Sequence, residues 1–245
     1  MPNPSRSPSA PPFRSPDPLA LGIVIPTLNA ADALRDTLAA LAVPTPGIEL
    51  DVVVVDGGSE DATLDIAQRF GARIAAAEGG RGPQLAEGAR VVFGEWLFFL
   101  HADTLPPPDW VDQVRGFAAR PDADRRAGYF RFALDDREGP APRRVERFVA
   151  WRSRVLGLPY GDQGLLLSRA RYERAGGYPP VPLMEDVALV RRIGRRDLVA
   201  LDGVALTSSA RYRRRGYLRR GARNLICLAL YFVGLSPHLI RRLYG

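Results

Sequence analysis

The chain has 245 residues, of which 46% are hydrophobic and 25% are charged, as is usual for a globular protein. A single cysteine, Cys227, excludes an internal disulfide framework, and two histidines, His101 and His238, are too few for a zinc cluster of Cys and His ligands. The net charge of +7 comes from arginine without any lysine, which suits phosphate recognition and makes nucleic-acid binding the weaker interpretation.

The first 18 residues are rich in proline and serine and have no apolar run, so they predict a disordered tail without a signal peptide. From residue 19 to about 215 the pattern predicts one α/β domain, and residues 216–245 predict a C-terminal helical segment.

Short apolar runs alternate with helical periodicity along the domain. They predict strands over 21–26, 52–55, 73–76, 96–100, 129–134, 164–167 and 198–206. Helices are expected over 30–41, 62–70, 84–93, 109–119, 143–156, 168–176, 185–193 and 217–233. We expect Asn29, Asp61 and Ser168 to cap the helices that follow them.

Two of the apolar runs end in an aspartate. Asp56 follows the valine strand at 52–55, and Asp103 follows the strand at 96–100. Strand–helix alternation favours a parallel sheet, in which ligands bind beyond the carboxyl ends of the strands. The two carboxylates therefore predict a site for a metal ion, a nucleotide or both.

The chemistry of group transfer from a nucleoside diphosphate would use such a site. A divalent cation would neutralise the leaving diphosphate, and Asp103 could hold Mg²⁺ or Mn²⁺. A second carboxylate would take the proton from an acceptor hydroxyl, and Asp186, in the first turn of a helix beside Glu185, could do so.

Four motifs, in order and spacing, resemble those of family 2 glycosyltransferases. They are Ile23–Asn29, Val55–Asp61, His101–Asp103 and Glu185–Asp186, and the resemblance covers most of residues 20–215. A closer likeness, to the radical-SAM/selenodomain-associated transferases, rests on Gly80–Gly82, Phe99–Thr104 and Gly161–Gln163.

The resemblance implies a GT-A type fold, with a mostly parallel central sheet flanked by helices, and an inverting transfer from a nucleotide sugar. It further implies that Asp186 is the general base and that Asp103 holds the metal. From their positions in the sequence, we also expect Glu185 to assist Asp186, and Asp162 and Gln163 to contact the acceptor. The donor nucleotide would be bound by Pro26, Thr27, Asn29, Asp56, Arg81 and Asp103. The sequence departs from the family pattern at His101, which stands where the first aspartate of an Asp-x-Asp motif is expected; it either ligates the metal, orients the ribose or packs.

Several alternatives stay open. A nucleotidyltransferase would need a Gly-rich phosphate loop where Pro26 to Asn29 stand, and a non-catalytic nucleotide-binding module would make His101 the trace of a lost metal site. One of the arginines at 211, 213, 214 and 215 could reach the diphosphate. The identity of the acceptor is not readable from the sequence, and both a lipid and a small molecule stay open. The apolar segment 217–235 either lies at a membrane surface or packs on the domain or a second subunit, so we expect a cytoplasmic protein, free or peripheral at the inner face of the membrane.

Overall fold

A computed structural model describes residues 18–244. The tail expected over residues 1–18 lies outside this range except for its last residue. In the described part, the strands form an eight-stranded sheet in the order β3-β2-β1-β4-β7-β6-β8-β5. The strands are β1 (Leu19–Thr27), β2 (Ile48–Asp56), β3 (Arg73–Ala76), β4 (Trp96–Phe99), β5 (Thr104–Leu105), β6 (Ala127–Leu134), β7 (Leu165–Ser168) and β8 (Leu198–Thr207).

Ten α-helices accompany these strands within residues 18–244. They are α1 (Ala31–Leu41), α2 (Thr63–Arg69), α3 (Arg81–Val91), α4 (Trp110–Ala118), α5 (Pro140–Trp151), α6 (Arg169–Arg174), α7 (Glu185–Ile193), α8 (Ala210–Arg215), α9 (Tyr217–Phe232) and α10 (Pro237–Tyr244). Short turns of 3-10 or π type lie at Ala123–Arg125, Arg152–Leu156, Gly161–Gln163 and Arg195–Asp197.

The first half of the sheet is parallel. β1 pairs with β2 on one side and with β4 on the other, and β2 pairs with β3, all in the same direction. These strands are continuous apolar runs because helices cover both of their faces. The carboxyl ends of β1, β2 and β4 therefore point to one edge of the sheet, as the sequence predicts.

The second half of the sheet is mixed. β7 runs antiparallel between β4 and β6, β8 pairs parallel with β6, and the short β5 pairs antiparallel with the end of β8. This pairing brings the turn Gly161–Gln163, which precedes β7, next to the loop that follows β4.

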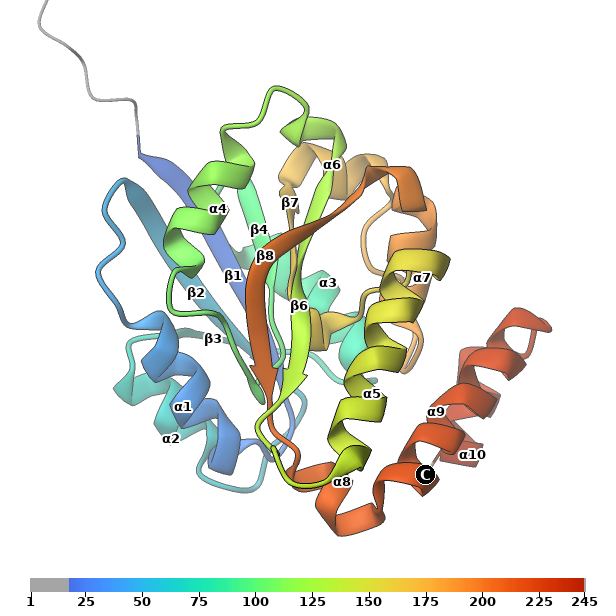
Figure 1. Ribbon diagram of the computed structural model, residues 1–245. Coiled ribbons are helices and arrows are strands. Elements are labelled where there is room, and N and C mark those ends of the chain that lie inside the picture. Colours follow the sequence, from blue (N-terminus) through green and yellow to red (C-terminus); the bar gives the residue numbers. More distant parts are fainter. Residues whose placement is uncertain (1–17, 245) are drawn as a thin grey trace, which may run out of the picture.

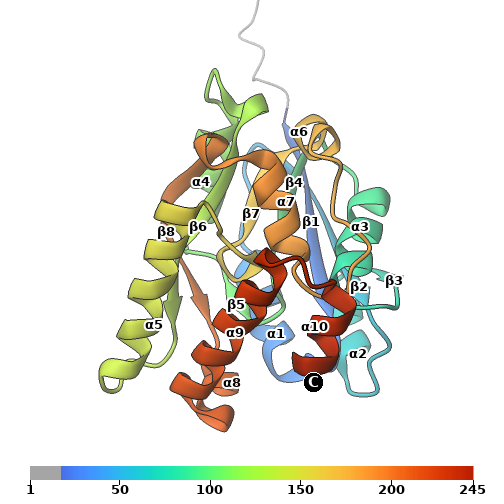
Figure 2. The same ribbon diagram turned by 90° about the vertical axis from the view of Figure 1, so that its right-hand side faces the viewer.

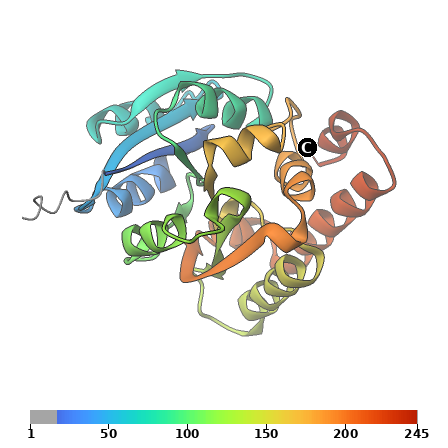
Figure 3. The same cartoon turned by 90° about the horizontal axis from the view of Figure 1, so that it is seen from above.

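Helices form a layer on each face of the sheet (Figures 1 and 3). One core cluster joins the sheet to α1, α2 and α4, with Trp110 and Phe98 stacked in its centre. The other joins the sheet to α3, α6 and α7, and Leu228 of α9 packs into it. Burial on both faces fixes the strands, so the loops at the carboxyl edge sit on a rigid frame.

The helix starts agree with the sequence in part. Ser168 caps α6 as predicted, because its side chain accepts from the amide of Arg171. Asn29 was expected to cap α1, but the cap position is Ala30, and Asn29 adopts a left-handed φ of 49°. Asp61 lies one residue before the cap of α2, and its carboxylate accepts from the amides of Thr63 and Ala31. It thereby ties the starts of α1 and α2 together.

Two helices begin earlier than predicted. The helix expected over 84–93 begins at Arg81, because Pro83 in a first turn needs no amide partner, and the helix expected over 143–156 begins at Pro140 and continues as a π-type turn over Arg152–Leu156. The helix expected over 217–233 is confirmed as α9, and a further helix, α10, begins at Pro237. β5 and α8 also lacked a sequence signal, since each is very short.

The C-terminal helices stand at one side of the molecule. α9 runs beside α5 and α10 lies against α9 (Figure 2). Within residues 18–244, every helix falls short of the length and apolar character needed to cross a membrane.

Candidate active site

A cavity of about 110 Å³ lies at the carboxyl edge of the sheet. Five segments of the α/β domain contribute to its wall, namely the start of α3, the loop after β4, the turn before β7, the start of α7 and the end of β8, and α8 and α9 contribute the rest. The residues that line it are Arg81, His101, Asp103, Tyr160, Asp162, Leu183, Met184, Glu185, Asp186, Val187, Thr207, Ser208, Arg211, Tyr212, Arg220, Asn224 and Cys227. Asp103, Asp162, Glu185 and Asp186 thus meet in one place, although they are far apart in sequence.

Asp186 is held rigidly at the start of α7. Its Oδ2 accepts from the backbone amide of Gly161 at 3.0 Å, and its Oδ1 accepts from the Tyr178 hydroxyl at 3.3 Å. The Nε2 atom of His101 lies 3.9 Å from Oδ2. Burial and the charge of Asp186 raise the pKa of Tyr178 well above its ordinary value, so the phenol keeps its proton and remains a donor.

Glu185 is fully buried beside Asp186. Its Oε1 lies 3.0 Å from Nε of Arg81, at the start of α3. Burial raises the pKa of Glu185 to about 7, with Arg81 opposing the rise and Asp186 adding to it. Glu185 therefore exchanges a proton near neutral pH, and the ion pair joins α3 to α7 across the cavity.

The backbone before this acidic pair is strained. Met184, at the cap of α7, has a left-handed φ of 67°, which is costly for a residue with a Cβ. Such strain gathers at functional sites, where the surrounding packing holds it in place.

Asp162, in the turn before β7, is the second carboxylate with an altered proton affinity. Burial raises its pKa to about 6, Arg152 opposes the rise, and Asp186 and Asp103 add to it. Its Oδ1 is buried without a hydrogen-bond partner among the described residues. Behind it the guanidinium of Arg152 stacks 3.4 Å from the ring centre of Tyr160. The buried arginine is thus the counter-charge of this side of the cavity.

His101 is uncharged in this setting. Burial lowers its pKa well below the ordinary value, and the charges of Arg81 and Arg211 lower it further. Its Nε2 is buried and makes no hydrogen bond within residues 18–244. A Cβ on Gly161 would come within 2.3 Å of this atom, so the imidazole fits only against a glycine.

Asp103 faces the cavity from the loop between β4 and β5. Its Oδ2 lies 3.6 Å from Nη1 of Arg211 in α8, and its backbone carbonyl accepts from the amide of Ser208 at 2.9 Å. The carboxylate is partly exposed to the cavity, and Arg211 is the member of the arginine group 211–215 that pairs with it.

Asp56 lies at the same sheet edge, at the end of β2. Burial would raise its pKa, but hydrogen bonds from Ser59, Thr27 and Gly58 together lower it. Its two oxygens accept from the Thr27 hydroxyl at 2.9 Å, from the amides of Gly58 and Ser59, and from the Ser59 hydroxyl. The carboxylate is thus ionised and orders the loop that follows β2.

The other candidate residues for donor and acceptor binding lie near these groups. Pro26 and Thr27 are buried at the end of β1, while Asn29 is exposed and accepts from the amide of Glu60. The amide of Gln163 is buried below the cavity, where it donates to the carbonyl of Phe130 and accepts from Ser153. Asp162 faces the cavity, whereas Gln163 anchors the turn that carries it.

Sequence reasoning missed several residues of the site. Tyr178 is buried behind the cavity wall, where its hydroxyl holds Asp186. It lies in the Gly-Gly-Tyr-Pro-Pro loop, and its spacing of eight residues from Asp186 was the signal that could have indicated it. Tyr212, Arg220 and Asn224 come from the C-terminal helices, where the guanidinium of Arg220 lies 4.7 Å from the ring centre of Tyr212.

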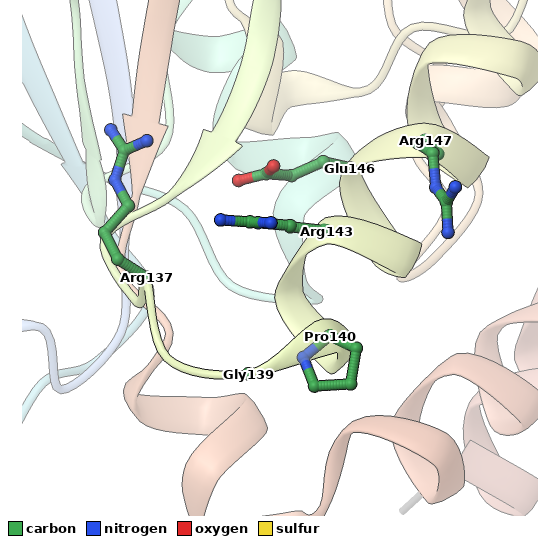
Figure 4. A pocket seen from close by; sticks show the side chains of 6 residues that line it. All are labelled: Arg137, Gly139, Pro140, Arg143, Glu146 and Arg147. Carbon is green, nitrogen blue, oxygen red and sulfur yellow. The ribbon is translucent and has the colours of Figure 1, made fainter.

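A larger hollow, of about 670 Å³, lies elsewhere, between the loop after β6 and the first turns of α5 (Figure 4). It is lined by Arg137, Gly139, Pro140, Arg143, Glu146 and Arg147. Its one carboxylate, that of Glu146, accepts from the backbone amide of Leu134. We assign the chemistry to the smaller cavity, because that is where carboxylates of raised pKa converge.

The mixed sheet with helices on both faces, and an acidic cavity at its carboxyl edge, define a chain of the GT-A class of glycosyltransferase folds. Residues 22–162 match the family profile described as "Glycosyl transferase family 2". The chain belongs to this family.

Relatives and solved structures are consistent with this assignment. The chain is 37% identical over 103 residues to a PGL/p-HBAD biosynthesis glycosyltransferase of Mycobacterium bovis, a match that covers 39% of this chain and 40% of the relative. It therefore spans less than half the length of this curated relative. TarS 1–349 of S. aureus in complex with UDP-GlcNAc superposes with a TM-score of 0.61 at 16% identity, over 91% of this chain and 69% of the TarS 1–349 chain. Glucosyl-3-phosphoglycerate synthase of Mycobacterium tuberculosis, in complex with Mn²⁺, UDP-glucose and phosphoglyceric acid, superposes with a TM-score of 0.55 at 20% identity, over 78% and 70% of the two chains.

Proposed function

We propose that this chain transfers a sugar from a nucleoside diphosphate sugar to an acceptor hydroxyl, with inversion, and that Asp186 is the general base. The observation that carries the proposal is the fixed carboxylate of Asp186, held by Gly161 and Tyr178 at the wall of a cavity that Asp103 and Arg211 also line. A general base must be held within hydrogen-bond reach of the proton that it removes.

The charges around the cavity suit a diphosphate leaving group. Arg81 and Arg211 place two guanidinium groups at the wall, and guanidinium groups bind phosphate oxygens in a fixed geometry. In this scheme Asp186 takes the proton of the acceptor hydroxyl while the arginines stabilise the charge that develops on the departing diphosphate. A single base on the acceptor side supports a single displacement, which inverts the anomeric carbon.

The residues fit a divalent cation bound together with the donor. No group of three or more His, Cys, Asp and Glu side chains within residues 18–244 is arranged to hold a metal by itself. Mg²⁺ and Mn²⁺, however, take one or two carboxylates and complete their shell with phosphate oxygens. Asp103 would hold the ion, and the uncharged Nε2 of His101 is chemically able to join it. When bound, such an ion supplies positive charge to the diphosphate.

The donor and acceptor ends of the site follow from the same scheme. The nucleobase of the donor would lie against Pro26, Thr27, Asn29 and the ionised Asp56, beside the start of α3. The acceptor would enter near Asp162, whose buried carboxyl and unpartnered Oδ1 (among the residues described) are able to orient a hydroxyl. The glucosyl and N-acetylglucosaminyl donors of the structural neighbours make UDP-sugars the first donors to test.

Asp186→Asn tests the general base. The amide keeps the shape of the side chain but cannot take a proton, so we expect turnover to fall by roughly 10²–10⁴-fold with donor affinity nearly unchanged. Donor affinity is measured by calorimetry, and turnover by release of nucleotide in the presence of an acceptor extract. Normal turnover of the variant would exclude Asp186 as the base.

Asp103→Asn tests the cation. We expect the variant to lose the part of donor affinity that depends on Mn²⁺, while any metal-independent binding stays. Asp65→Asn, at an exposed position on α2, is the matched control and should behave like the wild type. Donor binding without turnover by the wild type would favour a nucleotide-binding module over an enzyme.

A further inference from the structure

The exposed face of α9 is apolar. Its exposed positions repeat with helical spacing and are almost all apolar: Leu218, Ala222, Leu225, Ile226, Ala229, Phe232 and Val233, with Arg219 as the charged exception. Leu218 is 80% exposed, Ile226 58% and Val233 74%. A helix that only covers a domain turns its apolar face inward, so this outward stripe indicates a surface that has a further partner.

The opposite face of α9 is already in use. Arg220, Asn224 and Cys227 line the cavity, and Leu228 packs into the core cluster around α7. The polar groups of α9 thus face the candidate active site, while its apolar stripe faces away from the protein. Sliding or rotating α9 to bury the stripe would remove one wall of the cavity.

The charge around the stripe identifies the partner. The sequence after Asp202 contains nine arginines and no acidic residue, so the positive charge of this C-terminal segment exceeds the net charge of +7 of the whole chain. Arg214 and Arg219, together with Arg241 and Arg242 of α10, are exposed. In Figure 2, α9 and α10 lie side by side on the same face of the molecule.

We propose that the outward face of α9 and α10 binds peripherally to an anionic membrane surface. An interfacial helix buries its apolar side at the boundary of headgroups and acyl chains, while neighbouring arginines attract anionic lipids. A second copy of the chain fits less well, because a two-fold contact would place the same arginine-rich surface against itself. Leu239 of α10, half exposed, extends the apolar surface beyond α9.

The test is sedimentation of the full-length protein with vesicles of phosphatidylcholine, with and without phosphatidylglycerol. We expect binding to the vesicles that contain phosphatidylglycerol and a decrease as salt is raised. Ile226→Glu should weaken this binding by about tenfold or more, because it replaces a membrane-buried apolar side chain with a charge. Ile74→Glu, on the edge strand β3, introduces the same change at a position that is 45% exposed and should leave binding unchanged.

A second variant, Leu218→Ser, guards against a folding defect, since it removes an apolar side chain without adding charge. Both variants are checked by thermal unfolding, and sedimentation velocity gives the oligomeric state. Equal binding of wild type and Ile226→Glu would overturn the proposal. So would a wild-type dimer that ignores vesicles and dissociates in Ile226→Glu, which would make the stripe an interface between copies. Neither readout depends on sugar transfer.

Discussion

At the scale of single residues, His101 packs so closely on Gly161 that no side chain would fit there. A methyl group on Gly161 would stand 2.3 Å from His101 Nε2, and the amide of Gly161 holds Asp186. We expect Gly161→Ala to destabilise the fold by about 1–3 kcal/mol, the usual cost of overpacking, and to reduce turnover because the contact with Asp186 shifts. Chemical denaturation and steady-state kinetics measure the two effects.

The double variant Gly161→Ala, His101→Ala separates the causes. If the clash with the imidazole is responsible, removing the ring should restore most of the lost stability. An equally unstable double variant would show that the backbone at Gly161, not the imidazole, is what the methyl group disturbs.

The sequence predicted some of these residues for a clear physical reason. Asp103 follows an apolar strand, and Asp186 begins an amphipathic helix, so each has a local signal of its position. The burial of Arg152 behind Asp162, the hydroxyl of Tyr178 on Asp186 and the left-handed backbone of Met184 are tertiary in origin. No local pattern encodes such contacts, because they depend on how distant loops meet.

At the scale of elements, Gly88 lets α3 pack closely on the sheet. An added Cβ on Gly88 would stand 2.2 Å from Val24 Cγ1 and 2.9 Å from Val55 Cγ2, so the helix packs directly on β1 and β2. We expect Gly88→Ala to cost about 1–3 kcal/mol and to weaken donor binding, since α3 carries Arg81 into the cavity.

Gly116, in α4, is the matched control for this substitution. Space around it is open, with nothing within 4 Å of an added Cβ. Gly116→Ala should therefore stabilise the protein by roughly 0.5–1 kcal/mol, through the higher helix propensity of alanine. Equal effects of the two substitutions in urea denaturation would contradict the close packing of α3.

Elements with strong periodicity were predictable, and short ones were not. The valine run of β2 predicts a strand, and the spacing of the leucines of α1 predicts a helix, from local pattern alone. β5 has two residues and α8 has six, too few for a period to show. The antiparallel direction of β7 is likewise decided by its pairing with β4 and β6, and not by its own residues.

At the scale of the whole molecule, stability should depend on the protonation of Glu185. Its pKa is raised from 4.5 to about 7 in the fold, so the folded protein holds the proton more tightly than the unfolded chain. That contribution to stability is complete below the unfolded pKa and is lost as the pH rises through about 7. Glu185→Gln removes the titrating group and keeps its shape.

The prediction concerns the difference in the free energy of unfolding between Glu185→Gln and the wild type. The stability of Glu185→Gln relative to wild type should rise between about pH 5 and pH 7.5, by up to about 1.4 kcal/mol per pH unit. His101, whose pKa is lowered, acts with the opposite sign in this range, but it is present in both proteins and cancels. Urea unfolding in the presence of a chelator measures the difference. A difference that is constant with pH would exclude a raised pKa for Glu185.

One face of α9 lines the cavity and the other face is exposed at the surface. Arg220 and Asn224 lie on the cavity side and Ile226 lies on the outer side, fewer than two turns apart along the helix. A tilt of α9 moves its cavity side and its outer side together, because no loop lies between them. A ligand in the cavity that moves α9 would change the affinity of its outer face for the proposed membrane surface, and that surface would then change the affinity for the ligand by the same factor.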